Sequence, residues 1–176
     1  MKQTKLKTIA VVSACMMGML SSSAQGVMQR TANYHPDGRG FSCVNGNNRY
    51  TRALYGSVDE WRLETSDRPI FAIFKKNNHR NIRFVIKCNG QAFQLDSVEY
   101  CKARYEAGKR EYLMKDKRWG SGVLKLSVLA YPQTEGAVWK FAAENFGKAK
   151  IEIVGMICET RVSKFKRAGD IGKFDG

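Results

Sequence analysis

Short runs of apolar and β-branched residues, separated by turn residues, recur along the chain from about residue 41 onward. The clearest run spans residues 123–131, where leucine and valine at even numbers occupy one face while Lys125 and Ser127 point to the other. This period of two is typical of a half-buried strand. No amphipathic helices separate the runs, as a parallel α/β fold would require. The pattern therefore predicts an all-β fold, an antiparallel β-sandwich of about ten strands.

Turn signals set the expected order of these strands. Asn45-Gly46 and Asn89-Gly90 are dipeptides typical of two-residue hairpins, and Gly108 can supply the positive φ of a third tight turn. We therefore expect hairpins that join 41–44 to 49–55, 82–88 to 91–95, and 98–106 to 110–115. The polar segment 76–81 is expected to turn the run 70–74 into 82–88.

Two later segments complete the expected strand list. Residues 137–143 alternate as a strand does, although their alanines would also suit a helix, and we interpret them as a strand. Residues 151–160 form the last expected strand. The segment 161–176 is polar and basic, and its composition resembles a connection to a further region.

The first residues resemble a secretory signal. Lys2, Lys5 and Lys7 precede an apolar run that is too short to span a bilayer, and Ser22-Ser23-Ala24 provides the small residues of a cleavage site. We therefore expect residues 1–24 to be a signal peptide and residues 25–176 to form one β-sandwich domain, exported to the periplasm or the cell surface. The alternative is lipoprotein processing at Cys15, which would anchor the protein to a membrane.

The exported part is strongly basic. Removing the three leader lysines lowers Lys+Arg from 30 to 27, which against 16 Asp+Glu leaves a net charge of +11. Such a surface favours polyanions in a salt-dependent way. An exported protein meets acidic polysaccharide or an anionic cell surface more readily than nucleic acid, which we do not expect as a partner. Alternatively, the charge serves only solubility.

Four cysteines remain in residues 25–176: Cys43, Cys88, Cys101 and Cys158. They could form two disulfides with three possible pairings, or stay as buried free thiols. None belongs to a C-x-x-C pair and only two histidines are available, so we expect no metal site and no cofactor.

Candidate catalytic groups are sparse. Neither His35 nor His79 sits in a nucleophile–base motif. Glycoside hydrolysis needs two carboxylates at a defined separation, which sequence does not measure. The best-placed acids also suit turns or ion pairs: Asp59, Glu60, Asp96, Glu99 and Asp170. We therefore predict no catalytic residue.

Aromatic and arginine side chains are interleaved in a way that suits sugar binding. Tyrosine and tryptophan rings can stack on sugar faces while guanidinium groups bind hydroxyls or carboxylates, although both aromatic types also fill β-cores. Trp119 is the ring expected outside the core, because it precedes the loop Gly120-Ser121-Gly122.

Four segments carry a family resemblance: 45–57, 104–108, 119–122 and 167–172. Together they resemble the N-terminal region of secreted proteins assigned as glycosidases in glycan-degrading Gram-negative bacteria, a region described mainly as a domain of unknown function. That resemblance implies a β-sandwich followed by a helical toroid of the six-hairpin glycosidase type. The catalytic acids of such enzymes belong mainly to the toroid, which this chain does not include.

The resemblance therefore implies a front module of a longer architecture that helps to line a sugar-binding cleft and has no catalytic activity alone. The residues expected to bind carbohydrate are Asn48, Arg49, Arg52, Tyr55, Trp119 and Asp170. The alternative function is a stand-alone binding module for acidic glycans or anionic cell surfaces.

Overall fold

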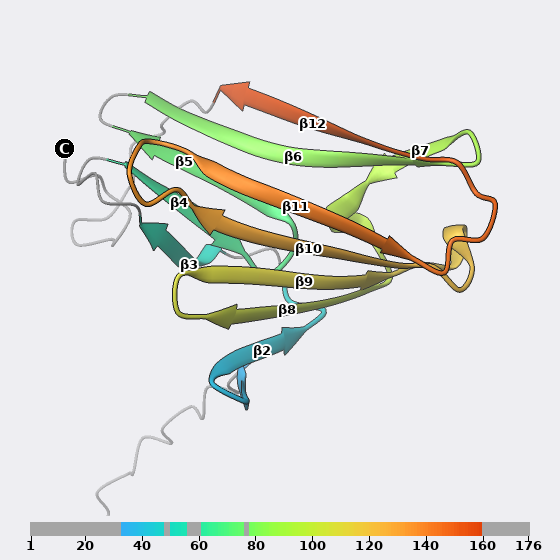
Figure 1. Cartoon of the computed structure of the whole chain (residues 1–176), viewed down its shortest axis with the longest axis horizontal. Helices are drawn as coiled ribbons and strands as arrows, with labels where there is room; N and C mark the ends of the chain where they lie inside the picture. The colour runs from blue at the N-terminus through green and yellow to red at the C-terminus, as the bar shows by residue number, and fades with distance from the viewer. Residues whose placement is uncertain (1–32, 48–49, 56–60, 76–77, 160–176) are drawn as a thin grey trace, which may run out of the picture. The chain divides into compact units, whose positions relative to one another are not determined.

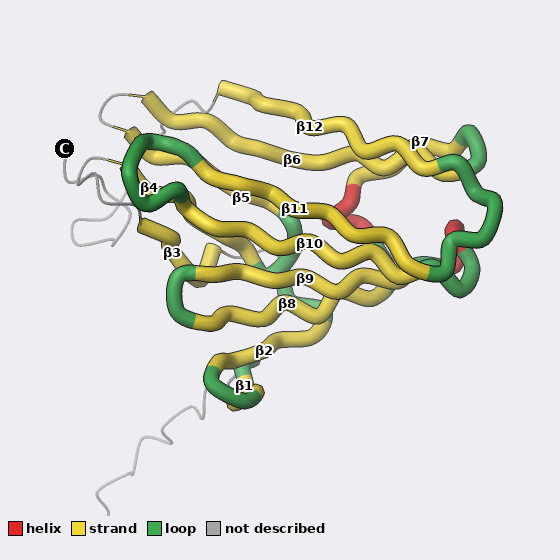
Figure 2. The backbone as a smooth tube through the Cα atoms, in the orientation of Figure 1, coloured by secondary structure: helices red, strands yellow, loops and turns green. Residues whose placement is uncertain are grey.

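Two antiparallel sheets face each other in a sandwich (Figure 1). The structure is a computed structural model that describes residues 33–47, 50–55, 61–75 and 78–159. These residues contain twelve strands, and their only helical segments are two short 3-10 turns (Figure 2). The predicted all-β sandwich is confirmed, with two strands more than the expected ten.

The first sheet has the order β1-β2-β8-β9-β10-β11. Its strands are β1 (His35–Asp37), β2 (Gly40–Val44), β8 (Tyr100–Glu106), β9 (Lys109–Lys115), β10 (Val123–Ala130) and β11 (Ala137–Glu144). The second sheet has the order β12-β6-β5-β4-β3, with β7 also paired to β6. Its strands are β3 (Tyr50–Tyr55), β4 (Trp61–Ser66), β5 (Ile70–Lys75), β6 (Asn78–Cys88), β7 (Gln91–Gln94) and β12 (Ile151–Glu159). The 3-10 turns are Leu95–Ser97 and Lys117–Trp119.

The hydrophobic core lies between the two sheets and follows the alternation of each strand. On β10, Leu124, Leu126 and Val128 are fully buried, as the sequence pattern predicts. On β6 of the opposite sheet, Ile82 and Ile86 face them within the same core cluster. Residues between these positions point outward, so each sheet presents a separate polar outer face.

Two of the three expected hairpins are confirmed. Asn89-Gly90 joins β6 to β7 with both residues at positive φ, 48° and 81°, as a type I′ turn requires. Gly108, at φ 76°, closes the turn between β8 and β9, in which Glu106 pairs with Lys109. The expected strand at 137–143 is also confirmed, as β11.

The predicted hairpin at Asn45-Gly46 is wrong, because β2 and β3 lie in different sheets. Asn45 instead extends the pairing of β2 with β8: its N–H donates to the carbonyl of Cys101, and its Oδ1 accepts from the Cys101 N–H. Gly46 then passes so close to Asp67 that an ideal Cβ would lie 2.3 Å from the Asp67 Cβ. The dipeptide therefore starts a crossover between the sheets.

Other differences concern strand limits. Residues 78–81, expected in a polar turn, instead pair with β5, and residues 76–77 lie outside the described residues. The sequence interpretation missed β1 and β4. In β4 the inward residues Trp61, Leu63 and Thr65 are buried, and their alternation was an available signal.

The four cysteines among the described residues are free thiols, and three of them agree with the expectation of buried free thiols. Cys43, Cys88 and Cys101 are buried, whereas Cys158 is exposed. Burial raises the pKa of Cys101 to about 12 and also raises the pKa of Cys43. The raised pKa values oppose ionisation of Cys101 and Cys43, and all three buried cysteines pack as core residues.

The predicted signal peptide, Cys15 and the polar segment 161–176 lie outside the described residues. All the described residues fall within one unit, residues 32–176. Within them, no helix has the length and apolar character needed to cross a membrane.

Candidate functional site

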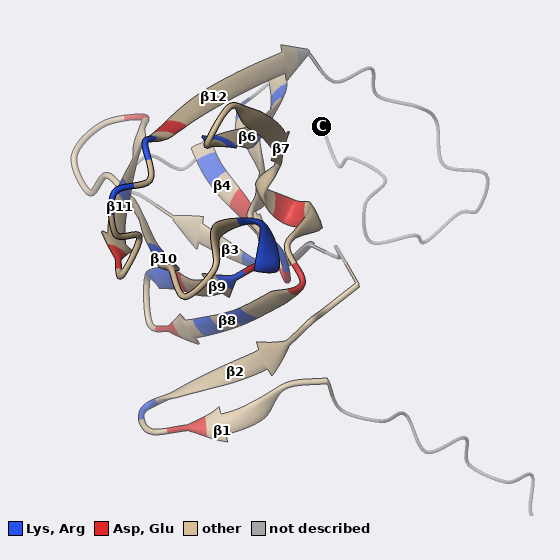
Figure 3. Ribbon diagram, turned by 90° about the vertical axis from the view of Figure 1, so that its right-hand side faces the viewer, with Lys and Arg blue, Asp and Glu red and all other residues tan. Residues whose placement is uncertain are grey.

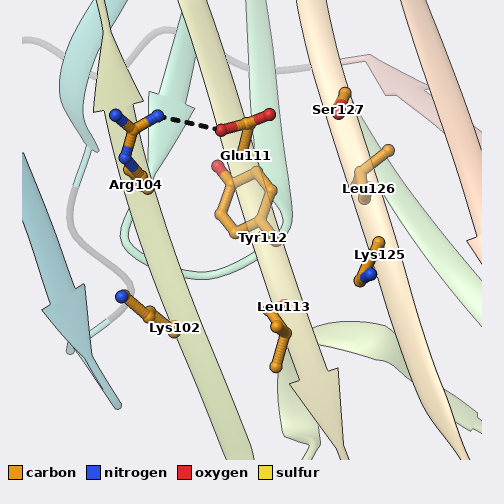
Figure 4. Close-up of a pocket in the computed structure, with 8 residues that line it drawn as sticks. All are labelled: Lys102, Arg104, Glu111, Tyr112, Leu113, Lys125, Leu126 and Ser127. Carbon is orange, nitrogen blue, oxygen red and sulfur yellow. Dashed lines mark hydrogen bonds and ion pairs between the residues drawn. The ribbon is translucent and has the colours of Figure 1, made fainter. Parts of the chain in front are cut away.

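A shallow groove on the outer face of the first sheet is the candidate site (Figure 4). It has a volume of about 230 Å³ and crosses three adjacent strands, β8, β9 and β10. The residues that line it are Lys102, Arg104, Glu111, Tyr112, Leu113, Lys125, Leu126 and Ser127. Tyr112 and Leu126 belong to the core, so the other six provide the polar and apolar groups open to a ligand.

Strand register arranges these side chains in two rows across the sheet. In one row, Leu113 of β9 lies between Lys102 of β8 and Lys125 of β10. In the other, Glu111 lies between Arg104 and Ser127. The groove thus has an apolar centre at Leu113 with a lysine on each side, carried by strands whose backbones are two strand spacings, or roughly 10 Å, apart.

Ion pairs hold the cations of the groove in place. Arg104 Nη1 lies 2.7 Å from Glu106 Oε2 and 3.1 Å from Glu111 Oε2. Lys102 Nζ lies 2.8 Å from Asp37 Oδ2, and Lys125 Nζ lies 2.7 Å from an oxygen of Glu144. These contacts leave N–H groups of each cation available, because an ammonium has three donors and a guanidinium five.

The acids beside the groove are kept ionised. A hydrogen bond from Arg104 lowers the pKa of Glu106, and a hydrogen bond from Lys102 lowers the pKa of Asp37. The same contacts with Glu106 and Glu111 raise the pKa of Arg104. A general acid needs a raised pKa, so Glu106 and Asp37 are tuned against that role.

Basic residues outnumber acidic ones on the outer face of β8 to β11. The six cations are Lys102, Arg104, Lys109, Lys115, Lys125 and Lys140, and the three acids are Glu106, Glu111 and Glu144. Figure 3 shows basic segments along β8 and β9. The face therefore attracts anions even after its internal ion pairs are counted.

A second group of polar residues is enclosed between the sheets. Arg110 is fully buried, with Nη2 2.9 Å from the carbonyl of Ser66 and 3.7 Å from Asp67 Oδ1. The Tyr34 hydroxyl donates to Asp67 and accepts from Arg110, which joins the segment before β1 to the core. Because Arg110 is shielded from solvent, we assign this group to the stability of the fold.

The sequence-predicted site residues are not brought together. Arg52 faces the interior, where its guanidinium carbon lies 5.5 Å from the ring centres of both Tyr34 and Tyr105. Tyr55 points the other way from β3 and is 69% exposed. The remaining predicted residues Asn48, Arg49 and Asp170 lie outside the described residues.

Trp119 requires a correction. The sequence placed it outside the core, yet it is only 5% exposed. Its ring lies between Phe93 and Phe146, with centroid distances of 5.8 and 5.6 Å. The adjoining Gly122 explains this, because its missing side chain leaves the space that the Phe146 ring occupies.

Of the candidate acids, Glu99 forms an exposed ion pair with Lys117 at 2.6 Å, and Asp96 is half-buried within the first 3-10 turn. Asp59 and Glu60 lie outside the described residues, as does Asp170. Within the part of the chain that the structure describes, no three His, Cys, Asp or Glu side chains are grouped to hold a metal ion.

Sequence reasoning missed most of the groove, although part of the signal was present. Lys125 and Ser127 were correctly placed opposite the buried face of β10. The β8–β9 hairpin was also predicted, and its register sets Arg104 opposite Glu111. What the sequence did not reveal was that β10 lies beside β9 in the same sheet.

One family model matches the chain, described as a domain of unknown function (DUF4450), and it covers residues 78–175. This range holds 98 of the 176 residues and includes the three strands of the groove. No curated protein and no solved structure matches the chain.

Proposed function

The chain belongs to the DUF4450 family, and we propose that its β-sandwich is a non-catalytic module that binds acidic carbohydrate in the groove on the first sheet. The finer part of the proposal is that the sandwich serves as the front module of a glycosidase-like protein of the six-hairpin type. The proposal also includes export of the protein to the periplasm or the cell surface.

The observation that carries the proposal is the row in which Leu113 lies between Lys102 and Lys125. Acidic sugars combine apolar C–H surface with carboxylate or sulfate groups. Leu113 offers the apolar contact, and the two lysines offer charge-assisted hydrogen bonds on either side. Because ion pairs already fix the cations, little side-chain entropy is lost when a ligand binds.

A binding role fits the groove better than catalysis. Among the described residues, Glu111 is the only carboxylate that lines the groove, and it bonds to Arg104. Glycoside hydrolysis needs a second carboxyl group across the scissile bond, with one of the two protonated. The neighbouring Glu106 and Asp37 have lowered pKa values and so stay charged.

The test is binding of the purified protein to polygalacturonate at increasing salt concentration, measured by calorimetry. We expect binding that weakens steeply with salt and that is lost in the double variant Lys102→Ala, Lys125→Ala. The matched control is Lys87→Ala, Lys150→Ala, which removes the same charge from two exposed lysines that both pair with Glu152 on the second sheet.

An equal loss of polygalacturonate affinity in both double variants would mean that binding depends only on the net charge of the protein. That result would contradict the groove as the binding site. Sugar release from polygalacturonate by the wild-type protein would contradict the non-catalytic role.

A further inference from the structure

Strands β3, β4, β5 and β6 are neighbours in the second sheet (Figure 1). Each contributes one side chain to a row across the outer face of this sheet. The register places Tyr55 of β3 opposite Arg62 of β4, Arg62 opposite Phe74 of β5, and Phe74 opposite His79 of β6. Their neighbours Leu54 and Leu63 are buried in the core, so the row faces outward. We call these four residues the Tyr55 row.

Direct contacts order most of the Tyr55 row. The guanidinium carbon of Arg62 lies 4.3 Å from the centre of the Phe74 ring, and Nε donates to Glu64 at 2.8 Å. The rings of Phe74 and His79 have their centres 4.7 Å apart. Stacking on Phe74 and the bond to Glu64 thus fix the plane of the Arg62 guanidinium. Among the described residues, its other N–H donors have no hydrogen-bond partner.

Tyr55 is the exposed end of the row. It is 69% exposed, and among the described residues it has no ring contact, ion pair or hydrogen bond. Beside the row, the next outward positions on β3 and β5 are Ala53 and Ala72, which add little side-chain bulk next to the tyrosine. The exposed Tyr55 ring and the fixed guanidinium of Arg62 therefore form an open face that combines an apolar surface with polar groups.

We propose that the Tyr55 row is a second saccharide-binding face, which takes a neutral glucose-configured chain by stacking one sugar ring on Tyr55. The equatorial hydroxyls of such a ring leave axial C–H groups that form apolar faces, and an aromatic ring matches such a face. Arg62 and Glu64 supply the donor and acceptor for hydroxyls at the ring edge.

This proposal rests on the proposed function only in taking carbohydrate as the class of ligand. The two sites are separate, because the groove and the Tyr55 row lie on the outer faces of different sheets. The groove recognises charge, whereas the Tyr55 row recognises an apolar ring face. Binding at the groove should therefore depend on salt and binding at the Tyr55 row should not. A module with both faces holds two polysaccharide chains, or two parts of one chain, at once.

The experiment is a titration of the purified protein with cellohexaose, followed by NMR and calorimetry at low and high salt. We expect salt-independent binding that Tyr55→Ala weakens by roughly tenfold, the loss of one aromatic stacking contact. Tyr55→Phe should bind as the wild type does, since the ring and not the hydroxyl carries the contact. Tyr131→Ala, which removes a 44% exposed tyrosine after β10, is the matched control and should change nothing.

The two proposals fail separately. The variant Lys102→Ala, Lys125→Ala should keep cellohexaose binding, and Tyr55→Ala should keep polygalacturonate binding. Unchanged cellohexaose affinity in Tyr55→Ala overturns the inference, as does a wild-type protein that does not bind cellohexaose. The latter result, with polygalacturonate binding retained, would favour a protein partner for this face and leave the groove unaffected.

Discussion

Arg118 holds both carboxylate oxygens of Asp116, with Nε 2.6 Å from Oδ1 and Nη2 2.6 Å from Oδ2. Asp116 also accepts backbone N–H bonds from Arg118 and from Glu99, which ties the end of β9 to the start of β8. The hydrogen bonds from Arg118, followed by these backbone bonds, lower the pKa of Asp116 to about 2. This ion pair closes the sandwich at the end where Trp119 is buried.

The first prediction concerns acid stability. The folded-state pKa of Asp116 lies below its ordinary value of 3.8, so its contribution is present above that pH and is lost as the pH falls towards 2. We expect Asp116→Asn to lower the free energy of unfolding by about 2 kcal/mol at neutral pH. Urea denaturation at several pH values measures this difference, which should shrink below pH 3.8.

Glu152→Gln is the control for this prediction. Its carboxylate also has a lowered pKa, caused by Lys150 and Lys87, but its side chain is 46% exposed. Exposed ion pairs contribute little to stability, so this variant should unfold almost as the wild type does. A loss in Asp116→Asn that stays constant between neutral pH and pH 2 would contradict the assignment.

The second prediction tests the crossover between the sheets. Gly46→Ala would place a Cβ 2.3 Å from the Asp67 Cβ, and backbone must move to relieve the overlap. We expect the free energy of unfolding to fall by roughly 1–3 kcal/mol. Gly136→Ala is the matched control, because its nearest neighbour would be 3.9 Å away. Equal stability of the two variants in thermal unfolding would refute the close approach.

These positions show how much the sequence could predict. Alternation along β10 and the Asn89-Gly90 turn depend on residues close together in the chain, and both were predicted correctly. Asn45-Gly46 has the same local chemistry as Asn89-Gly90. Its outcome differs because its partners, Cys101 and Asp67, are distant in the sequence.

In the candidate site too, local features could be predicted from the sequence and contacts between distant residues could not. The outward position of Lys125 was predictable from its own strand, whereas its place across Leu113 from Lys102 depends on which strands become neighbours. A sequence indicates that two consecutive strands pair with each other only when the turn between them is short. The longer connection through Lys117–Trp119 hid the pairing of β9 with β10.

The third prediction separates the core role of Trp119 from sugar binding. Trp119→Ala should lower the free energy of unfolding by about 3–5 kcal/mol, because it removes a buried ring. Trp119→Phe should cost less, since it keeps a ring against Phe93 and Phe146 and removes Nε1, which has no hydrogen-bond partner among the described residues. At temperatures where Trp119→Phe is folded, its affinity for polygalacturonate and cellohexaose should equal that of the wild type. A selective loss of affinity would restore Trp119 as a sugar-binding residue.

The fourth prediction concerns the cysteines of the protein after removal of residues 1–24. Cys158 is exposed, whereas Cys43, Cys88 and Cys101 are buried, and burial raises the pKa of Cys101 to about 12. The thiolate is the reactive form, so only Cys158 should react rapidly with a disulfide reagent in the native protein. The other three should react only after denaturation, and Cys158→Ser should abolish the rapid phase alone. If instead the denatured, unreduced protein exposes fewer than four thiols, the missing thiols are joined in disulfides, which would contradict the assignment of four free cysteines.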